Sequence, residues 1–77
     1  MSISPAQLKE ARRLLGWSQS DLGGLSGVSA TTIGYFEVGK RRPGVLDLSL
    51  VRRILEAAGV EFTNGGEPGV KLSRALR

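Results

Sequence analysis

The sequence predicts a mostly α-helical domain of four helices that ends in a β-hairpin. Serines that can cap helices precede apolar residues at helical spacing, and glycines follow where the helices should stop. Towards the C-terminal end, alternating apolar residues flank an Asn-Gly pair, which is typical of a hairpin. At 77 residues the chain has room for one small core, so we expect a single domain over residues 1–77.

We expect the first helix at about residues 5–15. Ser4 and Gln7 can form a capping box, and Pro5 stands at the first helical position, where its missing N–H costs nothing. Gly16 ends the helix. Its apolar face consists of Leu8, Ala11, Leu14 and Leu15.

Two short helices joined by a tight turn are expected at about residues 19–26 and 30–38. Ser18 and Ser29 can cap them, and Gly27 supplies a left-handed position in the turn. The expected buried residues are Leu22 and Leu25 in the first of these helices, and Ile33 and Phe36 in the second. Such a pair is the signature of a helix-turn-helix, whose second helix can lie in the major groove of DNA.

A fourth helix is expected at about residues 45–58, with two apolar stripes. One stripe closes the core and consists of Leu48, Val51 and Leu55. Leu50 and Ile54 form the other, which must be covered by something. Arg52 and Arg53 lie opposite, where we expect them to be solvated.

The hairpin is expected from strands at about residues 60–63 and 69–73, followed by a basic tail at 74–77. A lone two-stranded hairpin is marginal in water, so we expect it to pack on the second stripe of the fourth helix. Its exposed edge offers backbone groups to a strand of another chain. We therefore expect a homodimer joined through residues 60–73.

Composition argues against an enzyme and for an anionic partner. The chain has no histidine and no cysteine, so the commonest general base, the commonest metal ligand and a disulfide framework are all missing. We expect no catalytic residues, no metal and no cofactor. The apolar runs are too short for a membrane span, so we expect a cytoplasmic protein without membrane contact. The net charge of +4 favours an anionic partner.

The stretch from Ser18 to Pro43 resembles the Cro and phage-repressor (XRE) class of helix-turn-helix proteins. The resemblance extends from Leu8 to about Phe62. The residues that carry it are Ser18, Gln19, Leu22, Gly27, Val28, Ser29, Ile33, Phe36, Glu37, Gly39, Arg41, Arg42 and Pro43. It implies a four-helix domain like that of the lambda repressor, which binds double-stranded DNA.

The resemblance also implies roles for individual residues. Gln19 is expected to hydrogen-bond a DNA phosphate and to brace the recognition helix. Arg12 and Glu37 fall where the family places an ion pair between the first and third helices. Gly23 stands where the family has a small residue at the crossing of the two motif helices, whereas Gly24 has no such explanation.

The third helix should present Ala30, Thr31, Gly34 and Tyr35 outward, with Thr32 at its flank. Bidentate recognition of guanine requires Arg or Lys, and that of adenine requires Asn or Gln, yet none of these occurs between Ser29 and Val38. Direct readout should therefore be sparse, and Gly34 should leave a gap in the face. The basic run after the helix should contact phosphates. The DNA-contacting residues that we expect are Gln19, Ser29, Ala30, Thr31, Thr32, Gly34, Tyr35, Lys40, Arg41 and Arg42.

Two functions remain open from the sequence. The first is a DNA-binding transcriptional regulator of the Cro/repressor type, which acts as a dimer on paired half-sites. The alternative is a protein-interaction module on the same fold, such as an antitoxin or antiactivator. Such a module would use the hairpin edge or the apolar stripe of the fourth helix against a protein partner.

Overall fold

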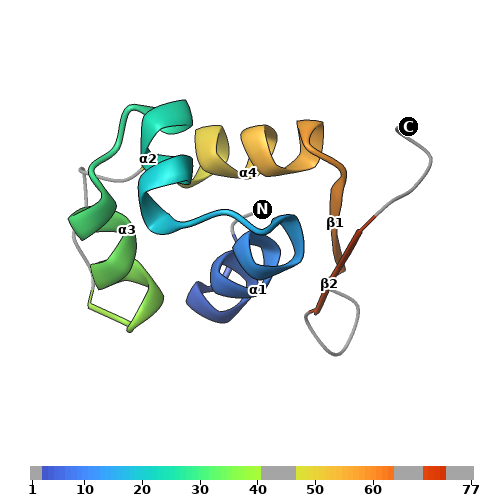
Figure 1. The fold of residues 1–77 in the computed structure, drawn as a ribbon. Helices are drawn as coiled ribbons and strands as arrows, with labels where there is room; N and C mark the ends of the chain where they lie inside the picture. The colour runs from blue at the N-terminus through green and yellow to red at the C-terminus, as the bar shows by residue number, and fades with distance from the viewer. Residues whose placement is uncertain (1–2, 41–46, 64–68, 73–77) are drawn as a thin grey trace.

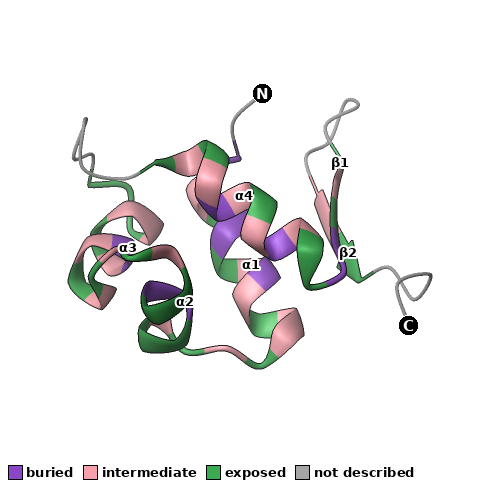
Figure 2. Cartoon of the chain, turned by 90° about the horizontal axis from the view of Figure 1, so that it is seen from above, coloured by how far each residue is buried: buried purple, intermediate pink, exposed green. Residues whose placement is uncertain are grey.

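The computed structural model describes residues 3–40, 47–63 and 69–72, which form four helices and an antiparallel two-stranded hairpin. This confirms the predicted fold class. The elements in chain order are α1 (Pro5–Leu15), α2 (Gln19–Ser26), α3 (Ala30–Glu37), α4 (Leu48–Ala57), β1 (Val60–Thr63) and β2 (Gly69–Leu72). In Figures 1 and 2, α2 and α3 lie at one end of the molecule, the hairpin lies at the other, and α1 and α4 lie between them.

Local capping explains where the first three helices begin. Ser4, Ser18 and Ser29 each accept a hydrogen bond from a backbone N–H three residues later. In α1 and α2 the side chain of the third helical residue, Gln7 or Asp21, also accepts a hydrogen bond from the backbone N–H of the capping serine, which completes a capping box. Gly16 and Gly27 then follow the first two helices in the left-handed conformation, with φ values of 73° and 76°.

The core lies where the helices meet the base of the hairpin. Its buried residues come from all four helices, from β1 and from the N-terminal segment (Figure 2). Trp17 and Phe36 pack against it while remaining partly exposed. The buried apolar residues are Ile3, Leu8, Ala11, Leu22, Ile33, Val51, Leu55 and Val60. No helix in the described part of the chain is both long and apolar enough to cross a membrane.

The fourth helix begins at Leu48, three residues later than predicted. Asp47 has an extended backbone and its carboxylate accepts a hydrogen bond from the Leu50 amide, so it is the cap of the helix. Residue 45 and residue 46 lie outside the described residues.

Leu25 was predicted to be buried and is instead 57% exposed. The buried positions of α2 are Leu22 and Gly23, so the inward direction of the helix lies between them. At 3.6 residues per turn, Leu25 points roughly 110° away from that direction. Spacing alone indicated a helix here but not the direction of its inner face.

The hairpin packs against α4, as predicted, and also against α1, which the sequence did not predict. Its register pairs Phe62 with Val70, and both side chains pack against the core, with β2 lying along α1 and β1 against the end of α4. The amide of Gln7, which is only 4% exposed, donates hydrogen bonds to the carbonyls of Thr63 and Gly69. The hairpin is therefore hydrogen-bonded to α1 in addition to its packing against α4.

Arg52 is also less solvated than expected. Its guanidinium lies 5.6 Å from the ring centroid of Phe62 in β1 and bonds the carboxylate of Glu56 at 2.8 Å. Arg52 thereby links the last turns of α4 to the hairpin, whereas Arg53 is exposed as predicted.

Candidate nucleic-acid interface

The two helices of the motif cross in direct backbone contact. An ideal Cβ placed on Gly23 would stand 2.5 Å from the carbonyl oxygen of Val28 and 3.4 Å from the amide nitrogen of Ala30. A side chain cannot fit at that distance from a backbone atom, so the crossing requires glycine. Gly24, by contrast, has open space where its Cβ would be.

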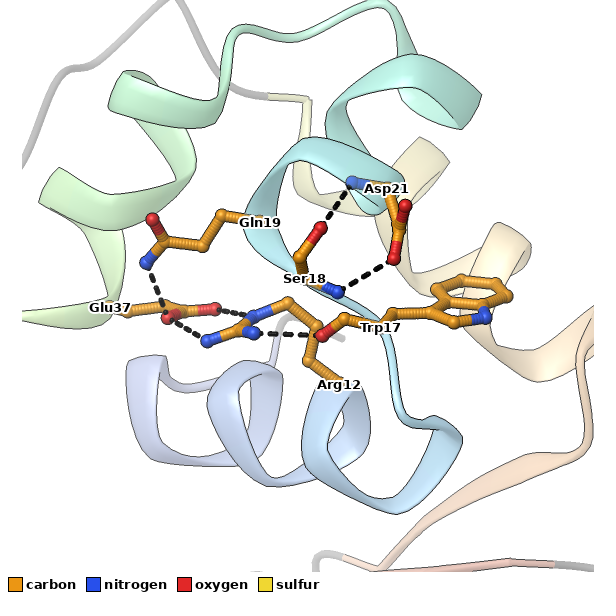
Figure 3. Close-up of polar contacts among 6 residues, drawn as sticks. All are labelled: Arg12, Trp17, Ser18, Gln19, Asp21 and Glu37. Atoms are coloured by element: carbon orange, nitrogen blue, oxygen red, sulfur yellow. Dashed lines mark hydrogen bonds and ion pairs between the residues drawn. The ribbon is translucent and has the colours of Figure 1, made fainter.

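A bidentate ion pair holds the end of α3 against α1. Arg12 Nε and Nη2 donate to the two carboxylate oxygens of Glu37 at 2.8 Å each, and Arg12 Nη1 donates to the carbonyl of Trp17 at 2.9 Å (Figure 3). The Glu37 side chain is 3% exposed and that of Arg12 is 14% exposed. The ion pair implied by the family resemblance is present, and it lies inside the structure rather than on the surface.

Gln19 joins this pair to the motif. Its amide nitrogen donates to Glu37 Oε1 at 3.1 Å. Because a carboxylate can only accept, the amide nitrogen must face Glu37 and the amide oxygen must face away, as Figure 3 shows. The nitrogen keeps a second N–H for another acceptor.

The ionisation of Glu37 reflects these contacts. Burial by itself would raise the pKa of Glu37, but hydrogen bonds from Arg12 and Gln19 and the positive charges of Arg12 and Lys9 outweigh it, so the pKa lies below its ordinary value. The hydrogen bond to Glu37 likewise raises the pKa of Arg12. Both groups are therefore charged at neutral pH.

The outer face of α3 carries two of the predicted contact residues. Thr31 and Tyr35 are exposed, with Tyr35 41% exposed, on the side of the helix opposite the buried Ile33. Ala30 and Gly34, also predicted to face outward, lie beside that face and are half-buried. Gly34 does not leave the expected gap, because the Gln19 amide covers it: an ideal Cβ there would stand 3.2 Å from both amide heavy atoms.

The other two hydroxyls at the start of α3 are bonded to each other. Ser29 Oγ accepts the Thr32 amide hydrogen at 3.1 Å and donates to Thr32 Oγ1 at 2.9 Å. The Ser29 hydroxyl is thus used in capping, and Thr32 Oγ1 accepts a bond from within the same turn. The structure brings both residues to the start of α3, but it gives their hydroxyls a structural role.

A basic residue, Lys40, follows directly in the turn that ends α3. The amide of Lys40 donates to the carbonyl of Tyr35 at 2.8 Å and that of Gly39 to Phe36 at 3.0 Å, which is the Schellman pattern, with Gly39 at φ 87°. Lys40 is exposed at this turn. Arg41 and Arg42, predicted to contact phosphates, lie outside the described residues.

Lys9 is a candidate contact that sequence reasoning missed. Of the basic side chains that the structure describes, only Lys9, Lys40 and Arg53 form no ion pair. Lys9 is exposed one turn before Arg12 on α1, and its charge acts on Glu37 at the end of α3. The signal that could have found Lys9 is its spacing from Arg12. The two residues are three positions apart, so they share a face of α1, and Arg12 was expected to pair with Glu37.

The described ranges contain an open hollow but no cluster of metal ligands. No group of acidic, histidine or cysteine side chains there could hold a metal ion. An open hollow lies between the first turn of α1 and β2, but the Gln7 amide at its edge already bonds the hairpin. The residues that line the hollow are Ser4, Ala6, Gln7, Glu10, Gly69 and Val70.

Comparison with known families agrees with this geometry. Residues 8–63, more than two thirds of the chain, match the family model described as helix-turn-helix. No curated protein sequence matches the chain. The matched region contains α2, α3, the Arg12–Glu37 pair and Gln19, and the family is one of DNA-binding regulatory domains. The chain therefore belongs to the Cro/C1-type helix-turn-helix (XRE) family.

Proposed function

We propose that this protein is a transcriptional regulator of the Cro/repressor type that places α3 in the major groove of duplex DNA. The observation that carries the proposal is the exposed face of α3, which the Gly23 crossing and the Arg12–Glu37 pair hold in a fixed orientation. A recognition helix must be fixed in this way, because its few contacts discriminate between sequences only if their geometry is constant.

Phosphate contacts would orient the protein on the duplex. The second N–H of Gln19 can donate to a phosphate oxygen while the first remains on Glu37. Lys40 after α3 and Lys9 on α1 have no carboxylate partner among the described residues, so their charges would neutralise DNA phosphates. Arg41 and Arg42 would extend this contact as predicted from the sequence.

The proposed mechanism is occupancy of an operator. A regulator bound at a promoter blocks polymerase, or contacts it when bound beside it, without any catalytic step. A regulator of this kind must be in the same compartment as the DNA that it binds, so the proposal includes a cytoplasmic location.

We propose further that the protein binds paired half-sites as a homodimer joined through the hairpin. The hairpin lies at the opposite end from α2 and α3 (Figure 1), so pairing there would leave both recognition helices free. Leu72 on β2 is 40% exposed and could pack between the subunits. Sedimentation of the whole protein at tens of micromolar should show a dimer, and Leu72→Lys should give a folded monomer. Leu25→Lys, at an exposed leucine of α2, is the matched control and should remain dimeric. A monomeric wild-type protein would overturn the dimer.

The alternative of a protein-interaction module receives less support. Leu50 and Ile54 on α4 are half-buried, and the large exposed apolar side chains among the described residues lie elsewhere. The stripe on α4 is thus a poor docking face, which leaves the hairpin edge for a protein partner. No observation on that edge favours a foreign protein over a second copy.

Selection of bound duplexes from a random DNA pool tests the proposed function. We expect a palindromic consensus whose affinity falls steeply with salt, because bound phosphates release counterions. Arg41→Ala combined with Arg42→Ala should weaken binding to all sequences and flatten the salt dependence. Absence of any enriched sequence would contradict the proposal.

A further inference from the structure

The outer face of α3 is chemically unusual for a helix that reads bases. Its exposed side chains, Thr31 and Tyr35, are uncharged and are followed by the exposed Val38 at the end of the helix. At 3.6 residues per turn, Thr31 and Tyr35 are only about 40° apart around the helix, so they form one stripe. No side chain on this stripe can make a bidentate hydrogen bond to a purine.

The neighbouring polar groups do not compensate for this. The hydroxyls of Ser29 and Thr32 are bonded to each other in the first turn of α3. The amide nitrogen of Gln19 is held by Glu37, so this side chain cannot turn freely to match the donors and acceptors of a base. The exposed side chains of α3 thus offer methyl and ring carbon over most of their surface, with one hydroxyl each on Thr31 and Tyr35 for single hydrogen bonds.

One base presents a matching group in the major groove. Thymine projects a C5 methyl there, and apolar contact from Ala or Thr methyl groups or an aromatic ring is a recognised way to read it. We propose that α3 selects its site chiefly by burying thymine methyl groups against Thr31 and Tyr35. This inference rests on the proposed function, because it needs α3 to lie in the groove.

The test uses the duplex that the protein selects and its deoxyuridine versions. Deoxyuridine keeps every hydrogen-bonding group of thymine and removes only the methyl group. We expect one or two thymines in each half-site whose replacement lowers affinity by about fourfold each, the value for burying one methyl-sized group. At the same positions, 5-methylcytosine should bind more tightly than cytosine, because it restores the methyl group.

Two matched variants of Thr31 assign the contact. Thr31→Val keeps the methyl group and removes the hydroxyl, so it should bind normally and remain sensitive to deoxyuridine. Thr31→Ser keeps the hydroxyl and removes the methyl group, so it should bind more weakly and lose sensitivity at one position. Circular dichroism would show that both variants remain folded.

The failures of this inference and of the proposed function are distinguishable. A selected consensus that binds equally well with deoxyuridine overturns methyl reading and leaves the DNA-binding function intact. Methyl reading is also overturned if Thr31→Val loses binding and Thr31→Ser does not, since the hydroxyl would then be the reader. If the pool yields no consensus, the proposed function and this inference both fall.

Discussion

The side-chain amide of Gln19 occupies the space beside Gly34 that a larger residue would fill. An ideal Cβ on Gly34 would stand 3.2 Å from both the nitrogen and the oxygen of the amide, while the same nitrogen donates to Glu37. Because Gly34 has no side chain, a residue of α2 can lie against α3. The position of Gln19 depends on Gly34 as well as on Glu37.

The first prediction is that Gly34→Ala weakens DNA binding without unfolding the protein. The new methyl group pushes the Gln19 amide away by a few tenths of an ångström, while alanine favours the helix by up to about 1 kcal/mol. We expect about fivefold weaker binding to the selected duplex, equivalent to part of one hydrogen bond. Fluorescence anisotropy measures the affinity and urea unfolding checks stability. If Gln19 transmits the effect, adding Gln19→Ala to Gly34→Ala should cost less than Gln19→Ala does in the wild type.

The second prediction contrasts the two adjacent glycines of α2. Gly23→Ala should destabilise the protein by about 2 kcal/mol or more, because the methyl group would meet the Val28 carbonyl and force the helices apart. Gly24→Ala meets nothing within 4 Å and should stabilise the protein by about 0.5–1 kcal/mol. Urea unfolding measures both, and equal effects would contradict the proposed crossing.

The third prediction concerns acid. The pKa of Glu37 is lower in the folded protein than in the unfolded chain, so the unfolded chain binds more protons as the pH falls. The stabilisation from Glu37 should be complete above about pH 5 and be lost as the pH falls through the folded pKa. Glu37→Gln should lower the free energy of unfolding at pH 7 by about 3 kcal/mol, because it leaves Arg12 without a counter-charge. The gap between variant and wild type should shrink as the pH is lowered.

Glu10 provides the matched control for this experiment. Its pair with Arg13 lies on the surface, where the two side chains are 42% and 66% exposed. Glu10→Gln should therefore change stability little at any pH, since solvent screens such pairs. A pH-independent gap for Glu37→Gln would show that its charge is not the stabilising feature.

The fourth prediction is that Lys9 contacts a phosphate. Lys9→Ala should weaken binding to every duplex alike and reduce the slope of log affinity against log salt by about 1, as loss of one phosphate contact does. Lys40→Ala should behave in the same way. Lys71→Ala is the control, because Lys71 is on the hairpin at the far end, 3.7 Å from the carboxylate of Glu61. A change confined to particular base pairs would show instead that Lys9 reads bases.

Local signals predicted the parts of this fold that depend on local chemistry. The capping serines and the glycines after α1 and α2 act within a few residues, so the bounds of these helices could be predicted from sequence. The cap of α4 by Asp47 is equally local, and a carboxylate three residues before Leu50 was the signal that could have found it. The small residue required at Gly23 was also predictable, from the family resemblance.

Long-range packing was not predictable in the same way. Leu25 has helical spacing, but only the placement of α2 against its neighbours turns it outward. The hairpin lies along α1 because Gln7 bonds the Thr63 carbonyl, a contact between residues 56 positions apart. Two further features depend on the assembled structure: the Gln19 amide covers Gly34, and no acidic side chain among the described residues pairs with Lys9. These contacts decide which of the predicted site residues are exposed.

The most direct test of the proposed function is to map the DNA-binding face by NMR. Amide shifts of the ¹⁵N-labelled protein would be followed while the selected duplex is added. We predict that the largest changes fall on Gln19, on Thr31 to Lys40 and on Lys9, while amides at the far end of the hairpin strands change little. Changes concentrated on β1, β2 and α4, with α3 unaffected, would contradict the proposal and indicate that another face of the protein makes the contact.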